Sequence, residues 1–198
     1  MLAAALVALA LAAPPVTHDV VPVVVAPVHP GTARGVDYEY TWGSKAGAIP
    51  HLGVFDRPRR ARDVLPRVAR TFVRFAHADE RASRLLLSAG STRIYAVPKD
   101  RGAQLCVLRE PSGGGTCVGS FAHDAYPQVQ PRDAVWGVVD DGAVQVDVTI
   151  AHHVAHAGLG RNAFFLALPH GAVAPSRIVV RERDGIRHVY VVKRLRPA

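Results

Sequence analysis

Two cysteines, Cys106 and Cys117, constrain the fold of this chain more than any other feature. They are the only cysteines among 198 residues, and three consecutive glycines lie between them at 113–115. Directly opposed residues of antiparallel strands have Cα atoms ~4.5–5.5 Å apart, within the ~4.4–6.8 Å that a disulfide spans. The spacing therefore predicts a disulfide-closed β-hairpin whose turn is centred between Pro111 and Ser112.

Redox or metal chemistry is the alternative use of two cysteines. A redox pair normally has Cys-x-x-Cys spacing beside a helix N-terminus, and a structural zinc site needs two further ligands at characteristic spacing. The sequence contains neither pattern. Disulfides persist in oxidising compartments, so the pair favours an exported protein.

The N-terminal sequence also points to export. Residues 2–13 are an uninterrupted apolar run, too short for the ~20 residues of a membrane-spanning helix but typical of a signal peptide. The positive residues that normally precede such a run are missing. We expect a cleaved signal peptide at 1–13 and an extracellular or cell-envelope location, with no transmembrane segment.

A segment rich in proline and valine follows, at residues 14–34. Prolines remove backbone donors and favour extended geometry in the residues before them, so this segment is expected to be a semi-rigid stalk. The remaining residues, 35–198, have the length of a single domain, since domains commonly contain ~100–200 residues.

One amphipathic helix is predicted after Asp63, which suits an N-cap position. Leu65, Val68, Phe72 and Phe75 recur at helical spacing and form an apolar stripe. We expect this stripe to face the core of the domain.

Positive charge is concentrated around the same helix. Nine arginines and four acidic residues lie between residues 56 and 84, in a chain of formal charge +8. Basic surfaces attract polyanions, which for an exported protein are anionic lipids or wall polymers rather than nucleic acid. Arg67, Arg70 and Arg74 are therefore candidates for contact with an anionic surface, although a solvated helix face explains the same pattern.

The rest of the chain has the alternating period of β-strands. Pairs of strands joined by turns are predicted at 85–97, 135–150 and 177–192, and the last has the Asp184-Gly185 turn typical of a hairpin. We predict a mainly β fold of about eight antiparallel strands, sandwich-like or in two sheets, with one helix. An α+β fold is the alternative.

Two further groups of residues are candidate binding sites. Tyr38, Tyr40 and Trp42 alternate along an extended segment, so their rings share one face, where they could stack on a wall glycan or simply pack on a sheet. His152 and His156 would lie on one side of a strand and could hold a metal with further ligands, although polar residues at a strand end are the simpler account.

Catalytic and cofactor motifs are missing from the sequence. The Gly158–Ala163 segment matches a dinucleotide-binding fingerprint, but Pro169 leaves no room for the helix that this motif requires, so a turn between strands is expected. We therefore expect no enzyme activity and no cofactor.

The order of several short motifs resembles a group of uncharacterised exported proteins of high-GC actinobacteria. The likeness covers most of residues 53–168, where this chain departs by having Asp140-Asp141-Gly142 in place of Pro-Asp-Gly and histidines at 152–156 in place of a polar turn. The resemblance implies export, the disulfide and a β-rich body, and it implies no activity. The motifs are Phe55-Asp-Arg-Pro58, Asp63-Val-Leu-Pro66, Ala82-Ser-Arg-Leu85, Tyr95-Ala-Val-Pro98, Leu105-Cys106, Cys117, Trp136–Gly142 and Arg161–Phe164.

The sequence thus predicts an exported, disulfide-stapled, non-catalytic module, either secreted or associated with the cell envelope. Binding to a wall glycan or an anionic surface, and binding of a metal by histidines, are the alternatives. No specific partner and no oligomeric state can be derived from it.

Overall fold

The computed structural model describes residues 21–23, 46–111, 114–122, 125–130 and 133–192. The predicted signal peptide, most of the predicted stalk and the aromatic segment 38–42 lie outside the described residues. Within the range of the predicted stalk, Val21–Val23 form strand β1, which pairs in parallel with β15.

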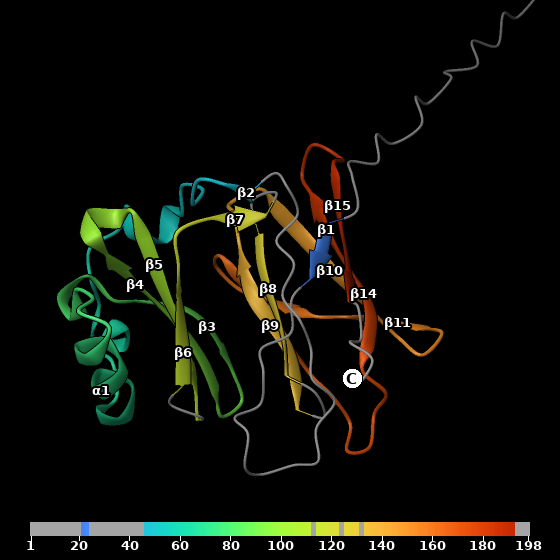
Figure 1. The fold of residues 1–198 in the computed structure, drawn as a ribbon, viewed down its shortest axis with the longest axis horizontal. Coiled ribbons are helices and arrows are strands. Elements are labelled where there is room, and N and C mark those ends of the chain that lie inside the picture. Colours follow the sequence, from blue (N-terminus) through green and yellow to red (C-terminus); the bar gives the residue numbers. More distant parts are fainter. Residues whose placement is uncertain (1–20, 24–45, 112–113, 123–124, 131–132, 193–198) are drawn as a thin grey trace, which may run out of the picture.

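Three β-sheets follow one another across the molecule, with the helix α1 (Arg67–Phe75) on the outside of the first (Figure 1). We call them the helix-side, middle and far sheets. The helix-side sheet consists of β3 (Arg84–Ala89), β4 (Thr92–Lys99), β5 (Gln104–Glu110) and β6 (Gly114–Val118), in that order.

The other two sheets are built mainly from the C-terminal half of the chain. The middle sheet has the order β12 (Gly158–Leu159), β13 (Ala163–Ala167), β9 (Ala134–Val139), β8 (Ala125–Gln130), β7 (Phe121–Ala122), β2 (Ala46–Gly47). The far sheet has the order β1, β15 (Arg187–Val192), β14 (Pro175–Glu182), β10 (Ala143–Ile150), β11 (His153–His156).

Four single-turn 3₁₀ helices lie in the described connections between these elements. They are η1 (Gly53–Phe55), η2 (Ala61–Asp63), η3 (Glu80–Ala82) and η4 (Asp100–Gly102).

Strand β9 explains why the middle sheet is covered on both faces. All six of its residues are buried, and its sequence is a continuous apolar run rather than an alternating one. Val135 and Val139 face the core shared with the far sheet, whereas Trp136 and Val138 face the helix-side sheet. A strand with two apolar faces is buried only if another layer covers each face. The far sheet covers one face of β9, and the helix-side sheet covers the other.

A third apolar cluster lies between the helix-side sheet and α1. Tyr95, Val97, Cys106 and Leu108 supply the sheet side of this cluster. The helix therefore covers the face of the sheet that the middle sheet does not cover.

The predicted fold class is confirmed: the protein is mainly β with one α-helix, and its strands form three sheets. The hairpin around Gly90 and the one around Gly185 are present, and both glycines have positive φ. The turn at Asp140–Gly142 has a different role, because it passes the chain from β9 in the middle sheet to β10 in the far sheet. The 158–163 segment is a turn between β12 and β13, as expected.

The disulfide is confirmed. Cys106 on β5 pairs directly with Cys117 on β6, and their Cα atoms are 3.9 Å apart, closer than the ~4.5–5.5 Å expected for opposed residues. The register also pairs Arg109 with Gly114, so the hairpin is centred between Pro111 and residue 112 as predicted.

The predicted orientation of the helix is wrong in part. Leu65 is buried and Phe72 packs partly against the sheet, but Val68 is 52% exposed and Phe75 is 84% exposed. The buried positions are instead Ala69 and Val73, which follow Leu65 at intervals of four. A small alanine lets the helix approach the sheet closely, whereas the periodicity alone favoured the larger side chains.

Candidate functional site

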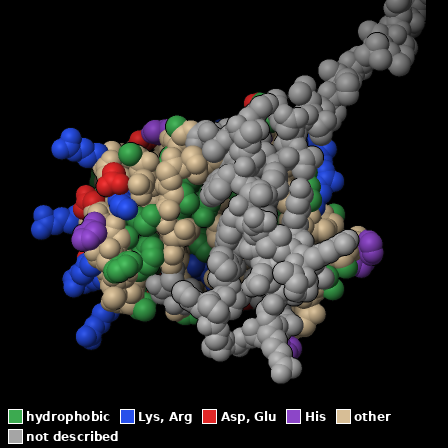
Figure 2. Space-filling model, viewed as in Figure 1, with side chains coloured by type: hydrophobic (Ala, Val, Ile, Leu, Met, Phe, Trp, Pro, Cys, Tyr) green, Lys and Arg blue, Asp and Glu red, His purple; other side chains and the backbone are tan. Residues whose placement is uncertain are grey.

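The outward face of α1 is the candidate functional site. Val68 and Phe75 lie seven residues apart on this face, and Val64 just before the helix is 43% exposed. Arg67 and Arg74, also seven residues apart, are exposed next to them. Figure 2 shows Lys and Arg side chains projecting from the edge of the molecule where Figure 1 places α1.

The segment before the helix is anchored by Asp63, which is fully buried. Its carboxylate accepts two hydrogen bonds from the guanidinium of Arg57, at 2.6 and 2.7 Å, and one from each of the backbone N–H groups of Arg60 and Leu85. The Ser83 hydroxyl donates to the Asp63 carbonyl. These bonds fix the start of α1 against β3.

The predicted N-cap at Asp63 is therefore wrong. Pro66 occupies the N-cap position of α1, and Asp63 is the last residue of η2. Burial raises the pKa of the Asp63 carboxyl, but the hydrogen bonds from Arg57, Leu85 and Arg60 outweigh that effect. Its pKa thus lies well below its ordinary value, and the group stays ionised.

The three arginines predicted for surface contact differ in their surroundings. Arg70 donates to the Leu65 carbonyl at 2.8 Å and pairs with Glu80 at 3.1 Å, so it mainly holds the helix in place. Arg74 lies 3.8 Å from Glu80 and stays exposed, and Arg67 has no acidic partner among the residues that the structure describes. Only Arg67 and Arg74 are thus available to an external anion.

Other arginines of the basic segment have structural roles. Arg57 is paired with Asp63, the guanidinium of Arg59 donates to the Ser83 hydroxyl, and that of Arg84 stacks 5.8 Å from the centre of the Phe55 ring. A count of charged residues in the sequence does not distinguish arginines that have internal partners from arginines that are exposed.

The two histidines predicted to bind metal differ in their surroundings. His156 on β11 pairs with the nearly buried Asp147 on β10 at 2.7 Å, and His152 lies in the turn before β11. Asp147 also accepts hydrogen bonds from Gln145 and Arg181. Burial raises the pKa of Asp147, but these three bonds lower it more.

That arrangement makes Asp147 the centre of a polar cluster on the far sheet. Within the described part of the chain, no three His, Cys, Asp or Glu side chains are placed so that they could hold a metal ion. The predicted glycan-stacking residues Tyr38, Tyr40 and Trp42 lie outside the described residues.

The comparisons with known proteins give no assignment. No protein-family model, no curated protein and no solved structure matches this chain. The resemblance to exported actinobacterial proteins stays a prediction. Among the described residues, no helix is long and apolar enough to cross a membrane.

The exposed apolar part of the helix face is what the sequence reasoning missed. A signal for it was present, because α1 carries two apolar stripes, one through Ala69 and Val73, which continues Leu65 before the helix, and one through Val68 and Phe75. A nine-residue helix cannot bury both stripes against a single sheet.

Proposed function

We propose that this protein is an exported, non-catalytic module of the cell envelope that docks on an anionic lipid surface through the outward face of α1. One observation carries the proposal: Val68 and Phe75 form an exposed strip on the outward side of α1, and exposed Arg67 and Arg74 flank it about 100° around the helix. Isolated exposed apolar residues are ordinary, but an apolar strip beside cations is typical of interfacial helices.

The combination favours a lipid surface over a wall polymer or a nucleic acid. Phosphates on a polymer would be bound by arginines alone and give no reason to expose a phenylalanine ring. A bilayer surface offers anionic head groups for Arg67 and Arg74 and an apolar layer just beneath for Phe75. Both halves of the face then have a partner.

The expected affinity is low. An arginine close to an anionic surface contributes about 1 kcal/mol, and burial of a phenylalanine side chain about 1.5–3 kcal/mol. Immobilising the domain opposes these gains. Attachment through α1 is therefore expected to be reversible and sensitive to salt.

Export is supported by the apolar residues 2–13 and by the disulfide between Cys106 and Cys117, which suits an oxidising compartment. Mass spectrometry of the protein recovered from its native host tests this part. We expect a chain that lacks the first residues up to about position 12 and contains no free thiol. An intact N-terminus together with two free thiols would contradict export.

Vesicle co-sedimentation tests the docking surface. The protein is expected to sediment with vesicles that contain phosphatidylglycerol, and to stay in solution with vesicles of phosphatidylcholine alone. The bound fraction should fall as salt is raised, because the arginine contribution is screened.

Two variants and a control make this test specific to α1. Phe75→Ser and the double variant Arg67→Gln/Arg74→Gln should each reduce sedimentation with anionic vesicles. Arg177→Gln removes an exposed arginine from the far sheet and should leave it unchanged. If Phe75→Ser and the parent protein bound anionic vesicles equally well, the partner would be a soluble polyanion rather than a lipid surface. If the parent protein did not bind these vesicles at all, the docking proposal would be wrong.

A further inference from the structure

A second candidate site lies beside the C-terminal end of α1, in a cavity of about 700 Å³. Its walls come from three segments that are distant in sequence: residues 49–55, the connection 77–79 that leaves α1, and the β4–β5 connection with its flanking residues 98–105. The size is within the range of ~300–1,000 Å³ that small-molecule sites commonly have.

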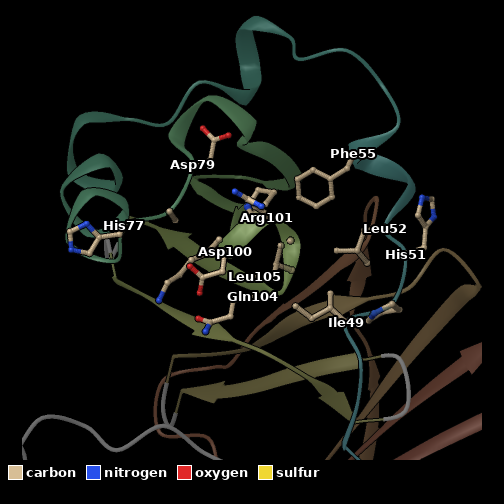
Figure 3. Close-up of a pocket in the computed structure, with 15 residues that line it drawn as sticks. Ile49, His51, Leu52, Phe55, His77, Asp79, Asp100, Arg101, Gln104 and Leu105 are labelled. Carbon is tan, nitrogen blue, oxygen red and sulfur yellow. The ribbon is translucent and has the colours of Figure 1, made fainter.

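One wall of the cavity is apolar. Ile49, Leu52, Phe55 and Leu105 line it, and Figure 3 shows these side chains grouped on the side of residues 49–55. Leu52 and Leu105 are also members of the core cluster between the helix-side and middle sheets, so this wall rests on well-packed structure.

The opposite rim has unusual backbone geometry. Of the five non-glycine residues with positive φ among the described residues, three line this cavity, namely His77, Asp100 and Arg101. Asp100 and Arg101 are consecutive, with φ of 52° and 57°. Left-handed non-glycine residues are disfavoured and persist where the surroundings require them, often at ligand sites.

The left-handed backbone of His77 belongs to the C-terminal end of α1. This residue occupies the left-handed position after the last turn of α1, where its N–H donates to the Arg74 carbonyl and that of Ala78 donates to the Val73 carbonyl. Glycine is the usual residue in this motif. A histidine here, and an arginine at 101, place side chains at the cavity where glycine would be less strained.

The rim carries two cations, Lys99 and Arg101, beside two carboxylates, Asp79 and Asp100. Lys99 and Arg101 have no acidic partner among the described residues. The carboxylate of Asp79 accepts the backbone N–H of Arg81, and His51 is paired with Asp56 and Asp141. Asp79 and Asp100 both keep their negative charge, so the four charged groups balance formally, and an anionic head is favoured by the N–H donors of Arg101 and Lys99 rather than by net charge.

We propose that this cavity binds a small amphiphilic anion. Its carboxylate or phosphate head contacts Arg101 and Lys99, and its apolar chain lies against Leu52, Phe55 and Leu105. Charge-assisted bonds to arginine are the stronger kind of hydrogen bond, and they orient the ligand at the rim. The site does not depend on the lipid-docking face, since Phe75, Arg67 and Arg74 do not line the cavity.

Calorimetric titration with single-chain amphiphiles tests the proposal, each used below its micelle concentration. Decanoate or decyl phosphate is expected to bind the whole protein with one-to-one stoichiometry, and the tighter of the two identifies the preferred head group. Decanol should bind about 10-fold more weakly, because it lacks the charge that Arg101 recognises. Decylamine should bind most weakly of all.

Variants then place the ligand in the cavity. Arg101→Gln should weaken decanoate binding about 10-fold or more, as expected for loss of one charge-assisted hydrogen bond. Phe75→Ser and Arg177→Gln should bind as tightly as the parent protein. Arg101→Gly should weaken binding and at the same time raise the melting temperature, since glycine relieves the left-handed backbone.

Three results would overturn the proposal. The first is that decylamine binds as tightly as decanoate. The second is that the folded Arg101→Gln variant binds decanoate with unchanged affinity. The third is that the folded parent protein binds neither anion. The membrane-docking proposal would survive each of them, because its variants are tested on vesicles.

Discussion

The guanidinium of Arg57 and the carboxylate of Asp63 form a buried pair joined by two hydrogen bonds of 2.6 and 2.7 Å. The pair closes the connection that leads into α1 and ties it to β3 through the backbone of Leu85. Docking of the helix on the helix-side sheet therefore depends on one ion pair that composition does not reveal.

Removal of one member of this pair should destabilise the fold strongly. We expect Arg57→Ala to lower the free energy of unfolding by about 3–5 kcal/mol, because it leaves a buried carboxylate without its counter-ion. Urea denaturation followed by circular dichroism measures the loss. Arg74→Gln is the control, because it removes only the exposed pair of Arg74 with Glu80, and it should cost no more than about 1 kcal/mol. Comparable losses for the two variants would contradict the difference in burial.

The lowered pKa of the Asp63 carboxyl predicts how the free energy of unfolding depends on pH. The pKa of Asp63 is lower in the folded protein than in the unfolded chain, so its contribution is fully present above pH ~5 and is lost as pH falls below ~4. Unfolding measured at several pH values between 7 and 2.5 should show this decline. Asp63→Asn should be less stable than the parent protein at neutral pH, and the difference should shrink in acid. A constant difference over the whole range would argue against a lowered pKa.

The disulfide should contribute to stability by restricting the unfolded chain. Reduction, or the double variant Cys106→Ala/Cys117→Ala, is expected to lower the free energy of unfolding by about 3 kcal/mol, the value for closing a loop of this size. Cys106 also packs beneath α1, so the alanine variant should lose somewhat more than the reduced protein. Denaturation of the parent protein with and without reductant gives the comparison. No effect of reductant on the unfolding midpoint would contradict the prediction.

Two glycines offer a matched test of how tightly β9 packs against its neighbours within the middle sheet. A Cβ atom at Gly137 would lie 2.5 Å from the Tyr126 carbonyl oxygen and 2.7 Å from the Phe164 ring, whereas one at Gly119 would meet nothing closer than 3.9 Å. Gly137→Ala should therefore lower the free energy of unfolding by about 1–3 kcal/mol, as overpacking does, and Gly119→Ala by less than about 0.5 kcal/mol. Thermal unfolding of both variants checks the difference. A tolerated alanine at 137 would show that β9 can move away from its neighbours.

Local pattern was sufficient for much of the fold. The alternation of apolar residues located most strands, the Asp184-Gly185 turn located a hairpin, and the spacing of the cysteines predicted the register of β5 with β6. These are interactions between residues close in sequence, so their signals lie within short windows.

The errors arose where the partner of an element is distant in sequence. The turn at Asp140–Gly142 looks like a hairpin turn, but β9 and β10 belong to different sheets, whose apolar faces meet in one core. Likewise, Val68 and Phe75 have helical spacing as good as that of Ala69 and Val73. The sheet surface of Tyr95 and Leu108, rather than the helix, selected which pair is buried.

The sequence by itself determined that this chain makes β-strands, one helix and a disulfide hairpin, because backbone propensity, turn residues and cysteine spacing act locally. Only the tertiary structure decided what is exposed. It placed Phe75 in solvent beside Arg67 and Arg74, and it brought Leu52, His77 and Arg101 around one cavity. Which face a helix buries, and which loops meet, depends on the packing of three sheets and on ion pairs such as Arg57–Asp63. Those contacts join residues whose separation along the chain carries no pattern.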